Sequence, residues 1–351
     1  MKFGIFYQIP CHVNQYAPDR YREVLYQIEL AEDLGFDSIW LGELHFDAAL
    51  GIMPSINVMA GAIAQRTSRM RIGLGVNIIP MHDPILNAEE AAMVDNLSEG
   101  RLEFGVGRGV LTFYDPFLIK PQESRERYAE ALDIIVGAWT QDSFSYEGKH
   151  FRVREASLVP RPVQQPHPPL TVAASGSQGV FDMAARRGMG VMAGLFLTSM
   201  ETLKDRVATY RKMEEDEGLP PKPGFLKILQ PTFVSETISD AQEATRASVD
   251  HYFDALKVNL STPAGARTID AVPEYRHFKE ARDEHSHRQI IKNGIDLYLP
   301  PDKTTERLEM FRSELPVGEM LHWFEMGGLV PHEKIVDSMK LFAKEVIPNF
   351  R

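Results

Sequence analysis

The sequence predicts an α/β fold, a closed (β/α)8 TIM barrel with insertions. Strand-like apolar runs alternate with longer amphipathic stretches along most of the 351 residues, which is the pattern of βαβ units in a parallel sheet. Eight such units follow one another without a break in composition, and this number favours a closed barrel over an open doubly wound sheet. Barrels of more than about 250 residues can form one domain. We therefore interpret residues 1–351 as a single domain.

The first unit shows how the elements are assigned. Residues 3–6 form a short apolar run, and residues 20–34 follow with Leu25, Ile28 and Ala31 at helical spacing before Gly35. The same reasoning assigns the other strands to residues 38–41, 70–76, 102–106, 170–173, 190–193, 227–234 and 320–324. The other helices are assigned to residues 53–65, 87–97, 123–140, 177–187, 200–217, 240–256 and 332–346. The first strand is expected to pair with the last and close the barrel.

Two segments interrupt the alternation and are interpreted as insertions. At about residues 141–160 the sequence alternates on both sides of Glu147-Gly148, which predicts a β-hairpin. At about residues 259–300 the periodicity is weak and polar residues are frequent, among them His277, His285 and His287. Such a stretch inside a compact domain is typical of a lid, a mobile loop or an inserted helix pair. We interpret it as a lid over the barrel mouth.

The composition argues against several classes of function. There are 38 Lys and Arg against 49 Asp and Glu, a formal charge of −11, which disfavours a surface for nucleic acids or anionic membranes. Cys11 is the single cysteine, so no intramolecular disulfide is expected, and a reducing cytoplasm fits best. No stretch approaches the ~18 apolar residues of a membrane span. The apolar N-terminus is interpreted as the first strand and not as a signal peptide.

Residues that follow the strands are the candidates for chemistry, because the active site of a barrel is built at the C-terminal ends of its strands. His45 stands five residues after Trp40, just beyond the second strand. A lone histidine is more often structural than catalytic, but the expected position at the mouth favours a catalytic role. Metal and hydrolase signatures are missing: there is no His-Glu-x-x-His and no Gly-x-Ser-x-Gly, and His285 and His287 fit a solvated loop better than a metal site.

Two further segments predict a site for one phosphate. Gly107-Arg108-Gly109 ends the fourth strand, where small residues admit a planar ligand and the arginine fork suits a phosphate. After the fifth strand, Ala174-Ser175-Gly176-Ser177-Gln178-Gly179 leads into a helix, and helix N-termini bind anions. The alternatives are a tight turn with a surface arginine and a serine that merely caps the helix. Together the two segments would grip a phosphate from two sides.

These residues, with the blocks around them, resemble the bacterial luciferase-like flavin-dependent monooxygenases over nearly the whole chain. The resemblance lies in residues 1–4 (MKFG), 35–46 (GFDSIWLGELHF), 97–109 (LSEGRLEFGVGRG) and 338–342 (SMKLF). It implies a barrel that binds reduced flavin mononucleotide (FMN) supplied by a separate flavin reductase. It further implies that the reduced FMN reacts with O2 to a flavin hydroperoxide, which oxygenates a small organic substrate.

The resemblance also assigns roles to individual residues. It places the FMN phosphate on Arg108 and on the segment with Ala174, Ser175, Ser177, Gln178 and Gly179, and the ring and ribityl chain beside Gly107, Val110 and Val172. Gly75 and Val76 match a position where a non-proline cis peptide lies beneath the isoalloxazine. His45 matches the second histidine of a Glu-His-His-Phe element whose first histidine is Leu44 here.

Departures from the family pattern narrow the expected activity. Leu44 replaces the histidine tied to light emission in luciferase, and Gly107 stands where luciferase has a reactive cysteine, so a non-luminescent enzyme is expected. Non-luminous relatives imply a homodimer formed through the helices after strands two and three, in the region of Glu89 and Asp95. Two alternatives remain open: a deazaflavin-dependent hydride-transfer enzyme on the same fold, and a non-catalytic flavin-binding protein. The substrate is not identified by the sequence.

Overall fold

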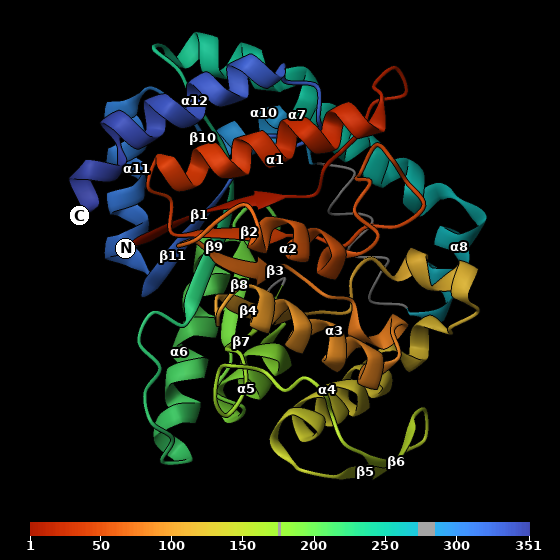
Figure 1. Ribbon diagram of the computed structural model, residues 1–351. Helices are drawn as coiled ribbons and strands as arrows, with labels where there is room; N and C mark the ends of the chain where they lie inside the picture. Colours follow the sequence, from red (N-terminus) through yellow and green to blue (C-terminus); the bar gives the residue numbers. More distant parts are fainter. Residues whose placement is uncertain (175–176, 273–284) are drawn as a thin grey trace.

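The strands of the computed structural model, which describes residues 1–174, 177–272 and 285–351, form a closed barrel of eight parallel strands (Figure 1). Strand β1 pairs with β2 on one side and with β11 on the other, and β8 pairs with β9, so the sheet has no free barrel edge. All eight strands lie where the sequence predicted them. They are β1 Lys2–Tyr7, β2 Ser38–Leu41, β3 Arg71–Leu74, β4 Leu102–Val106, β7 Leu170–Ala173, β8 Gly190–Gly194, β9 Leu226–Val234 and β11 Val317–Trp323.

Helices surround the strands on the outside of the barrel (Figure 1). Several begin at a side chain that caps the free backbone N–H groups: Ser55 accepts from Val58 N, and Asp83 accepts from both Ile85 N and Leu86 N. The outer helices are α1 Ala17–Asp33, α2 Ile56–Ala64, α3 Pro84–Leu97, α4 Ser124–Thr140, α5 Gln178–Arg186, α6 Met200–Asp216, α7 Ile238–Ser261, α11 Pro301–Glu314 and α12 His332–Glu345. Short 3₁₀ turns are η1 Ile79–Met81, η2 Leu111–Phe117, η3 Pro121–Glu123 and η4 Ile347–Phe350.

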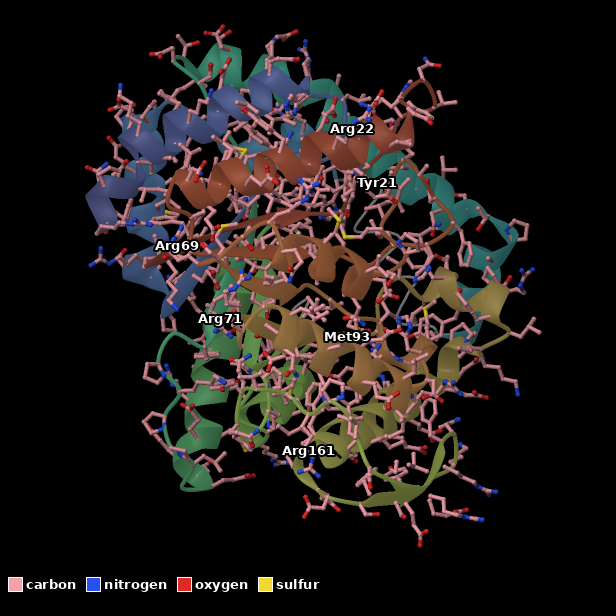
Figure 2. All side chains as sticks on the ribbon, viewed as in Figure 1. Tyr21, Arg22, Arg69, Arg71, Met93 and Arg161 are labelled. Atoms are coloured by element: carbon pink, nitrogen blue, oxygen red, sulfur yellow. The ribbon has the colours of Figure 1, made fainter. Side chains whose placement is uncertain are left out.

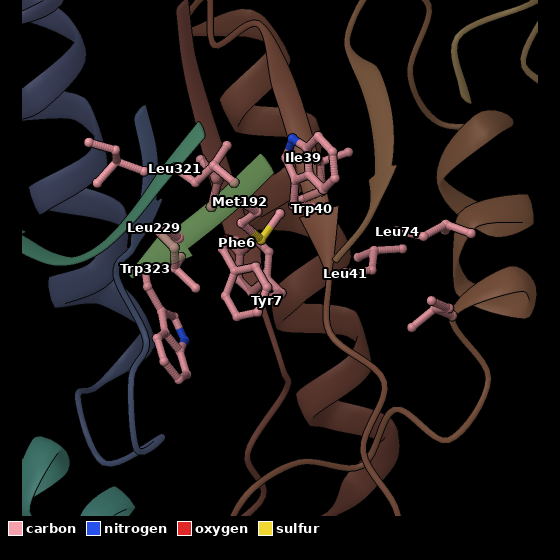
Figure 3. Packing of buried hydrophobic residues seen from close by; sticks show 14 of the residues in the cluster. Phe6, Tyr7, Ile39, Trp40, Leu41, Leu74, Met192, Leu229, Leu321 and Trp323 are labelled. Atoms are coloured by element: carbon pink, nitrogen blue, oxygen red, sulfur yellow. The ribbon is translucent and has the colours of Figure 1, made fainter. Parts of the chain in front are cut away.

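Large side chains fill the inside of the barrel. Trp40 is fully buried, and a side chain at Gly73 would overlap its ring, so the neighbouring strand carries glycine there. Nearer the C-terminal ends of the strands, Phe6 and Trp323 pack edge to face with ring centroids 5.2 Å apart (Figure 3). The barrel is therefore a packed core whose only available working surface is its mouth.

A charged layer lies near the opposite end of the strands. Lys227 Nζ is 3.1 Å from Glu103 and 3.2 Å from Glu319, and Arg71 Nε is 2.8 Å from Glu103. The burial of these charges is tolerable because each is paired.

The first insertion forms a hairpin at the periphery of the molecule (Figure 1). Strands β5 Phe144–Glu147 and β6 Arg152–Ala156 pair antiparallel and form a separate two-stranded sheet.

The second insertion is more structured than the polar sequence suggested. Helix α7 continues to Ser261, α8 Pro263–Ala271 follows, and α10 His287–Lys292 leads to β10 Leu297–Leu299, which pairs parallel with the end of β9. Residues 273–284, with His277, lie outside the described part of the chain.

His285 and His287 are not in a solvated loop, so that expectation was wrong. His287 is 4% exposed, stacks on Tyr298 at 5.0 Å and lies 2.9 Å from Thr245 Oγ1, and His285 Nε2 is 2.7 Å from the Phe196 carbonyl. Within the described ranges no group of three or more His, Cys, Asp or Glu side chains is placed to hold a metal ion. The helices of these ranges are also too short or too polar to cross a membrane.

Candidate active site

The candidate site lies at the mouth of the barrel, where the loops after the strands meet. Because the strands are parallel, their C-terminal ends all open toward this side. The loops after β2, β3, β4 and β7 carry the residues singled out in the sequence. A backbone bridge between Asn77 and Val106 extends the β3–β4 pairing toward the mouth and holds two of these loops together.

Three side chains form a hydrogen-bonded acid–base group after β2 and β3. Glu43 Oε1 lies 2.8 Å from Nε2 of His45 and 2.7 Å from Nε2 of His82. The second oxygen, Oε2, accepts a hydrogen bond from the backbone N–H of Ile78 at 2.8 Å. Glu43 is 5% exposed and His45 9% exposed. One buried carboxylate therefore holds both imidazoles in place.

The pKa values in this group shift as expected for a carboxylate paired with imidazolium. Burial by itself raises the pKa of Glu43, but hydrogen bonds from His45, His82 and the Ile78 N–H bring it below the usual value. Burial lowers the pKa of His82, but the hydrogen bond and charge of Glu43 and the charge of Glu90 raise it above the usual value. Glu43 thus stays ionised, and His82 keeps its proton to a higher pH than a free histidine.

Sequence reasoning selected His45 and missed its two partners. Glu43 satisfies the same criterion as His45, because it follows β2 directly, and could have been selected with it. His82 has no comparable local signal: it lies 39 residues from Glu43, and only the barrel brings the loops after β2 and β3 together.

Aromatic rings surround His45 on the solvent side. Its ring centroid is 5.5 Å from Phe46, 5.9 Å from Phe113 and 5.8 Å from Phe117. Phe113 is buried, whereas Phe46 is 66% and Phe117 47% exposed. Exposed phenyl rings at a barrel mouth form a surface suited to an apolar ligand.

The loops after β3 and β4 pack tightly against each other. The peptide bond between Gly75 and Val76 is cis, as the resemblance implied. A Cβ at Gly107 would lie 2.5 Å from Val76 Cγ2, so this position accepts no side chain without displacing the β3 loop. The Gly107 N–H donates to the Asn77 carbonyl at 3.0 Å, and the Asn77 side chain is bonded to Asn87 on α3 through both amide groups. The result is a firm bed of small residues.

Arg108 follows this bed and points toward the start of α4, where Nη1 lies 3.3 Å from Ser124 Oγ. Its carbonyl accepts a hydrogen bond from the Tyr114 hydroxyl at 2.8 Å, which fixes the loop. Val110 directly precedes η2, and Val172 is buried in β7.

The α5 side of the predicted phosphate site begins at the end of β7. Ala174 is buried, and its N–H donates to the Met192 carbonyl. Ser177 is the N-cap of α5, but its side chain makes no capping hydrogen bond, so the capping alternative does not account for it. Gln178 and Gly179 form the first turn, and no atom lies within 4 Å of a Cβ built on Gly179. Ser175 is outside the described residues.

Tyr128 on α4 is a further candidate that the sequence did not reveal. Its hydroxyl is buried and has no hydrogen-bond partner, although buried polar groups are normally bonded. Burial raises the pKa of Tyr128 far above its usual value, and the nearby charges of Arg187 and Arg108 only partly oppose this. A neutral hydroxyl donor therefore lies close to Arg108 without a partner, and an anionic ligand oxygen there would satisfy it.

Comparison with known proteins identifies a matching family and related sequences. The model of the family described as luciferase-like monooxygenase matches residues 1–310. The oxygenase component of a flavin-dependent trigonelline monooxygenase from Acinetobacter baylyi is 26% identical, over all of this chain and 96% of its own. A protein named y4wF from Sinorhizobium fredii is 37% identical over 73% of this chain and 74% of its own.

Solved structures share the fold over the whole chain. The monooxygenase RslO1 from Streptomyces bottropensis has a TM-score of 0.85 at 25% identity and full coverage of both chains. The oxygenating constituent of 3,6-diketocamphane monooxygenase from Pseudomonas putida, in complex with FMN, has a TM-score of 0.80 at 16% identity, covering 100% and 99%. An F420-dependent secondary alcohol dehydrogenase has a TM-score of 0.74 at 18% identity with the same coverage.

Proposed function

The chain belongs to the luciferase-like monooxygenase family, and from that premise we propose that it uses reduced FMN and O2 to oxygenate a small organic substrate. In this reaction one oxygen atom enters the substrate, the other leaves as water, and FMN is released oxidised. Reduced FMN, when bound, supplies the two electrons. The observation that carries the proposal is the Glu43, His45 and His82 group, which lies at the same mouth as the bed of small residues around Gly107.

The residues at the mouth fit FMN. Arg108, the first turn of α5 and the unpartnered Tyr128 hydroxyl suit the phosphate, because they offer a cation, helix N–H groups and a buried donor. The small and apolar positions suit the flat ring and the ribityl chain; they are Gly75, Val76, Gly107, Val110, Val172 and Ala174. Ser177, Gln178 and Gly179 complete the phosphate end.

His45 is the proposed acid–base residue. Glu43 fixes its ring through Nε2, which leaves Nδ1 for an oxygen atom of the bound reactants. Phe46, Phe113 and Phe117 pack around the ring, limit water at the reacting atoms and favour an apolar substrate. A dry pocket suppresses the wasteful release of H2O2.

Two protein partners complete the proposal. A separate flavin reductase would supply reduced FMN, and the name of the Acinetobacter relative, an oxygenase component, supports this division of labour. A second copy of the chain would cover the outer faces of α2 and α3, which pack side by side and expose Val58, Leu86 and Met93. Asp95 does not belong to that face, because it is fully buried and its carboxylate accepts hydrogen bonds from Gln164.

The deciding experiment compares two reduced cofactors. The protein is titrated anaerobically with reduced FMN and, separately, with reduced F420, and binding is followed by the fluorescence of Trp40, Trp139 and Trp323. Each complex is then mixed with ¹⁸O2 and a panel of apolar substrates. Tight binding of reduced FMN with one ¹⁸O atom in the product is the expected result. Binding of F420 with hydride transfer and no oxygen uptake would favour the deazaflavin alternative, whose fold likeness is the alcohol dehydrogenase.

A third outcome would contradict enzymatic activity altogether. A flavin-storage protein would bind oxidised and reduced FMN with similar affinity and yield no O2-dependent product with any substrate of the panel.

A further inference from the structure

Glu43 connects a buried imidazole with a partly exposed one through a single oxygen atom. Oε1 is within hydrogen-bond distance of both Nε2 atoms, and Oε2 is engaged by the Ile78 N–H. The side chain of His45 is 9% exposed, and that of His82 is 32% exposed. The three groups thus form a continuous path from the aromatic-lined site to the solvent-facing side of the η1 loop.

We propose that His82 is the solvent-side end of a proton relay that passes through Glu43 to His45. This inference rests on the proposed function, since it concerns how the acid–base residue of that reaction regains its proton. His82 has no assigned role in the oxygenation itself, and it touches neither the phenyl rings around His45 nor the small-residue bed by any described contact.

Each proton transfer in the relay is balanced. His45 gives the proton on Nδ1 to an oxygen atom of the reactants, and its Nε2 takes a proton from Glu43 Oε1. Glu43 in turn receives a proton from Nε2 of His82, which then recovers one from water. No net charge accumulates on Glu43, because it gains and loses one proton per cycle.

The surroundings of His82 favour the charged state that a donor needs. Glu43 faces it from the β2 loop and Glu90 from α3, and both raise its pKa. Asp83, next in the chain, is occupied as the N-cap of α3. On the α4 side the nearest cation, Arg127, is engaged through Nε with the Pro80 carbonyl. His82 is therefore protonated over part of the range in which a free histidine is neutral, and the relay should weaken once the pH exceeds the raised pKa of His82.

The competing explanation is purely structural: His82 would only anchor the η1 loop to Glu43. Substitution of His82 by glutamine separates the two explanations, because glutamine retains a hydrogen-bond donor for Glu43 but cannot exchange a proton near neutral pH. His150 provides a matched control, since its Nε2 also lies 2.9 Å from a glutamate, Glu126, beside the hairpin.

The first test needs no cofactor. Imidazole ¹⁵N and ¹³C signals of the labelled apo protein are followed through a pH titration. In the wild type, and in His150→Gln, the His45 signals should show a second inflection at the pH where His82 titrates. In His82→Gln this inflection should disappear while the His45 signals keep their dispersion. Identical His45 titration curves in the wild type and in His82→Gln would overturn the proposal.

The second test uses reduced FMN, O2 and an oxygenated substrate from the panel described above. Product formation by His82→Ala at low buffer concentration should fall by about tenfold or more and recover on addition of imidazole, while the wild type responds to neither change. A loss that imidazole does not rescue would assign His82 a structural role and contradict the relay. If the wild type binds no reduced FMN, the proposed function fails, whereas the apo titration still decides whether His45 and His82 are coupled.

Discussion

Arg108 is the residue that tests the phosphate end of the proposed FMN site. We expect Arg108→Ala to weaken the binding of reduced FMN by about 1.5–3 kcal/mol, because a charge-assisted hydrogen bond to phosphate is lost. Riboflavin, which has no phosphate, should bind almost unchanged. Anaerobic titration of both ligands measures the difference, and Arg186→Ala, at the exposed far end of α5, is the control.

An equal loss for both ligands would contradict the phosphate assignment. Arg108 would then act through the loop it stabilises, since its guanidinium contacts Ser124 and its carbonyl is bonded to Tyr114.

His45 tests the chemistry separately from binding. His45→Ala should leave the affinity for reduced FMN within a few-fold and lower product formation by about 10² or more, as expected when a positioned acid–base group is removed. Release of H2O2 per FMN oxidised should rise. Both quantities come from one assay of O2, H2O2 and product, and an unchanged product yield per FMN oxidised would remove His45 from the mechanism.

Single residues show where sequence reasoning about the site succeeds and where it stops. His45 and Arg108 directly follow strands, so the barrel pattern alone placed them at the mouth. His82 and Tyr128 belong to an η1 loop and a helix, and they meet the site only because of how the loops and α4 pack. Neither position differs in sequence from an ordinary surface histidine or a helical tyrosine.

At the scale of elements, helix α8 is held beside the mouth by polar contacts with η2. Arg267 forms a bidentate ion pair with Asp115 at 2.9 and 2.6 Å, and Thr112 Oγ1 donates to Asn259 Oδ1 at 2.6 Å. The proposed lid behaviour of residues 259–300 therefore has a definite point of attachment on α8.

Arg267→Ala should detach α8 more easily from η2. Because the Arg267–Asp115 pair is exposed and screened by salt, we expect cleavage within residues 262–272 by a protease to accelerate by less than about fivefold. The wild type at high salt should approach the rate of the variant. Arg246→Ala, which breaks an exposed pair with Glu243 elsewhere on α7, should not change this rate. Equal rates in wild type and Arg267→Ala would show that the ion pair does not hold α8.

Elements were predictable where hydrophobic periodicity is strong. The eight barrel strands carry compact apolar runs, and each was placed from them. Helix α11 and the packed segment of α10 and β10 were not predicted, because few apolar residues mark them: Leu308 and Phe311 in α11, Ile290 in α10 and Leu297 in β10. These side chains are buried by β9 and α7, so the tertiary contact and not the local pattern defines the elements.

At the scale of the whole molecule, the buried histidine in β11 limits stability in acid. His322 is completely buried among Phe3, Phe324 and Phe342, and burial lowers its pKa to about 3. In the unfolded chain its pKa is near 6.5, so between about pH 6.5 and 3 only the unfolded state binds this proton. His322 should therefore reduce the free energy of unfolding by up to about 1.4 kcal/mol for each pH unit below 6.5.

Urea unfolding of the wild type and of His322→Gln at pH 7 and pH 4.5 measures this effect. The variant is expected to be less stable at pH 7, because the packing is disturbed, but to lose less stability on acidification. A parallel loss in both proteins would show that other groups govern the acid response.

The final prediction concerns assembly, which depends on the outer face of α2 and α3. Val58 is 75% exposed, Met93 56%, Leu86 55% and Leu97 41%, and these side chains share one side of two adjacent helices (Figure 2). So many exposed apolar residues on neighbouring helices are typical of a subunit interface, and a second copy of the chain is the proposed partner.

We expect the wild type to sediment as a dimer at micromolar concentration. Val58→Lys and Met93→Lys should each raise the dimer dissociation constant by roughly 30-fold or more, because each brings an unpaired charge to the centre of the contact, where hot-spot losses reach about 2 kcal/mol. Val258→Lys is the matched control, an equally helical valine that is 66% exposed on α7. A dimer that Val58→Lys leaves intact and Val258→Lys dissociates would move the interface to α7, and a wild type that stays monomeric would contradict the dimer.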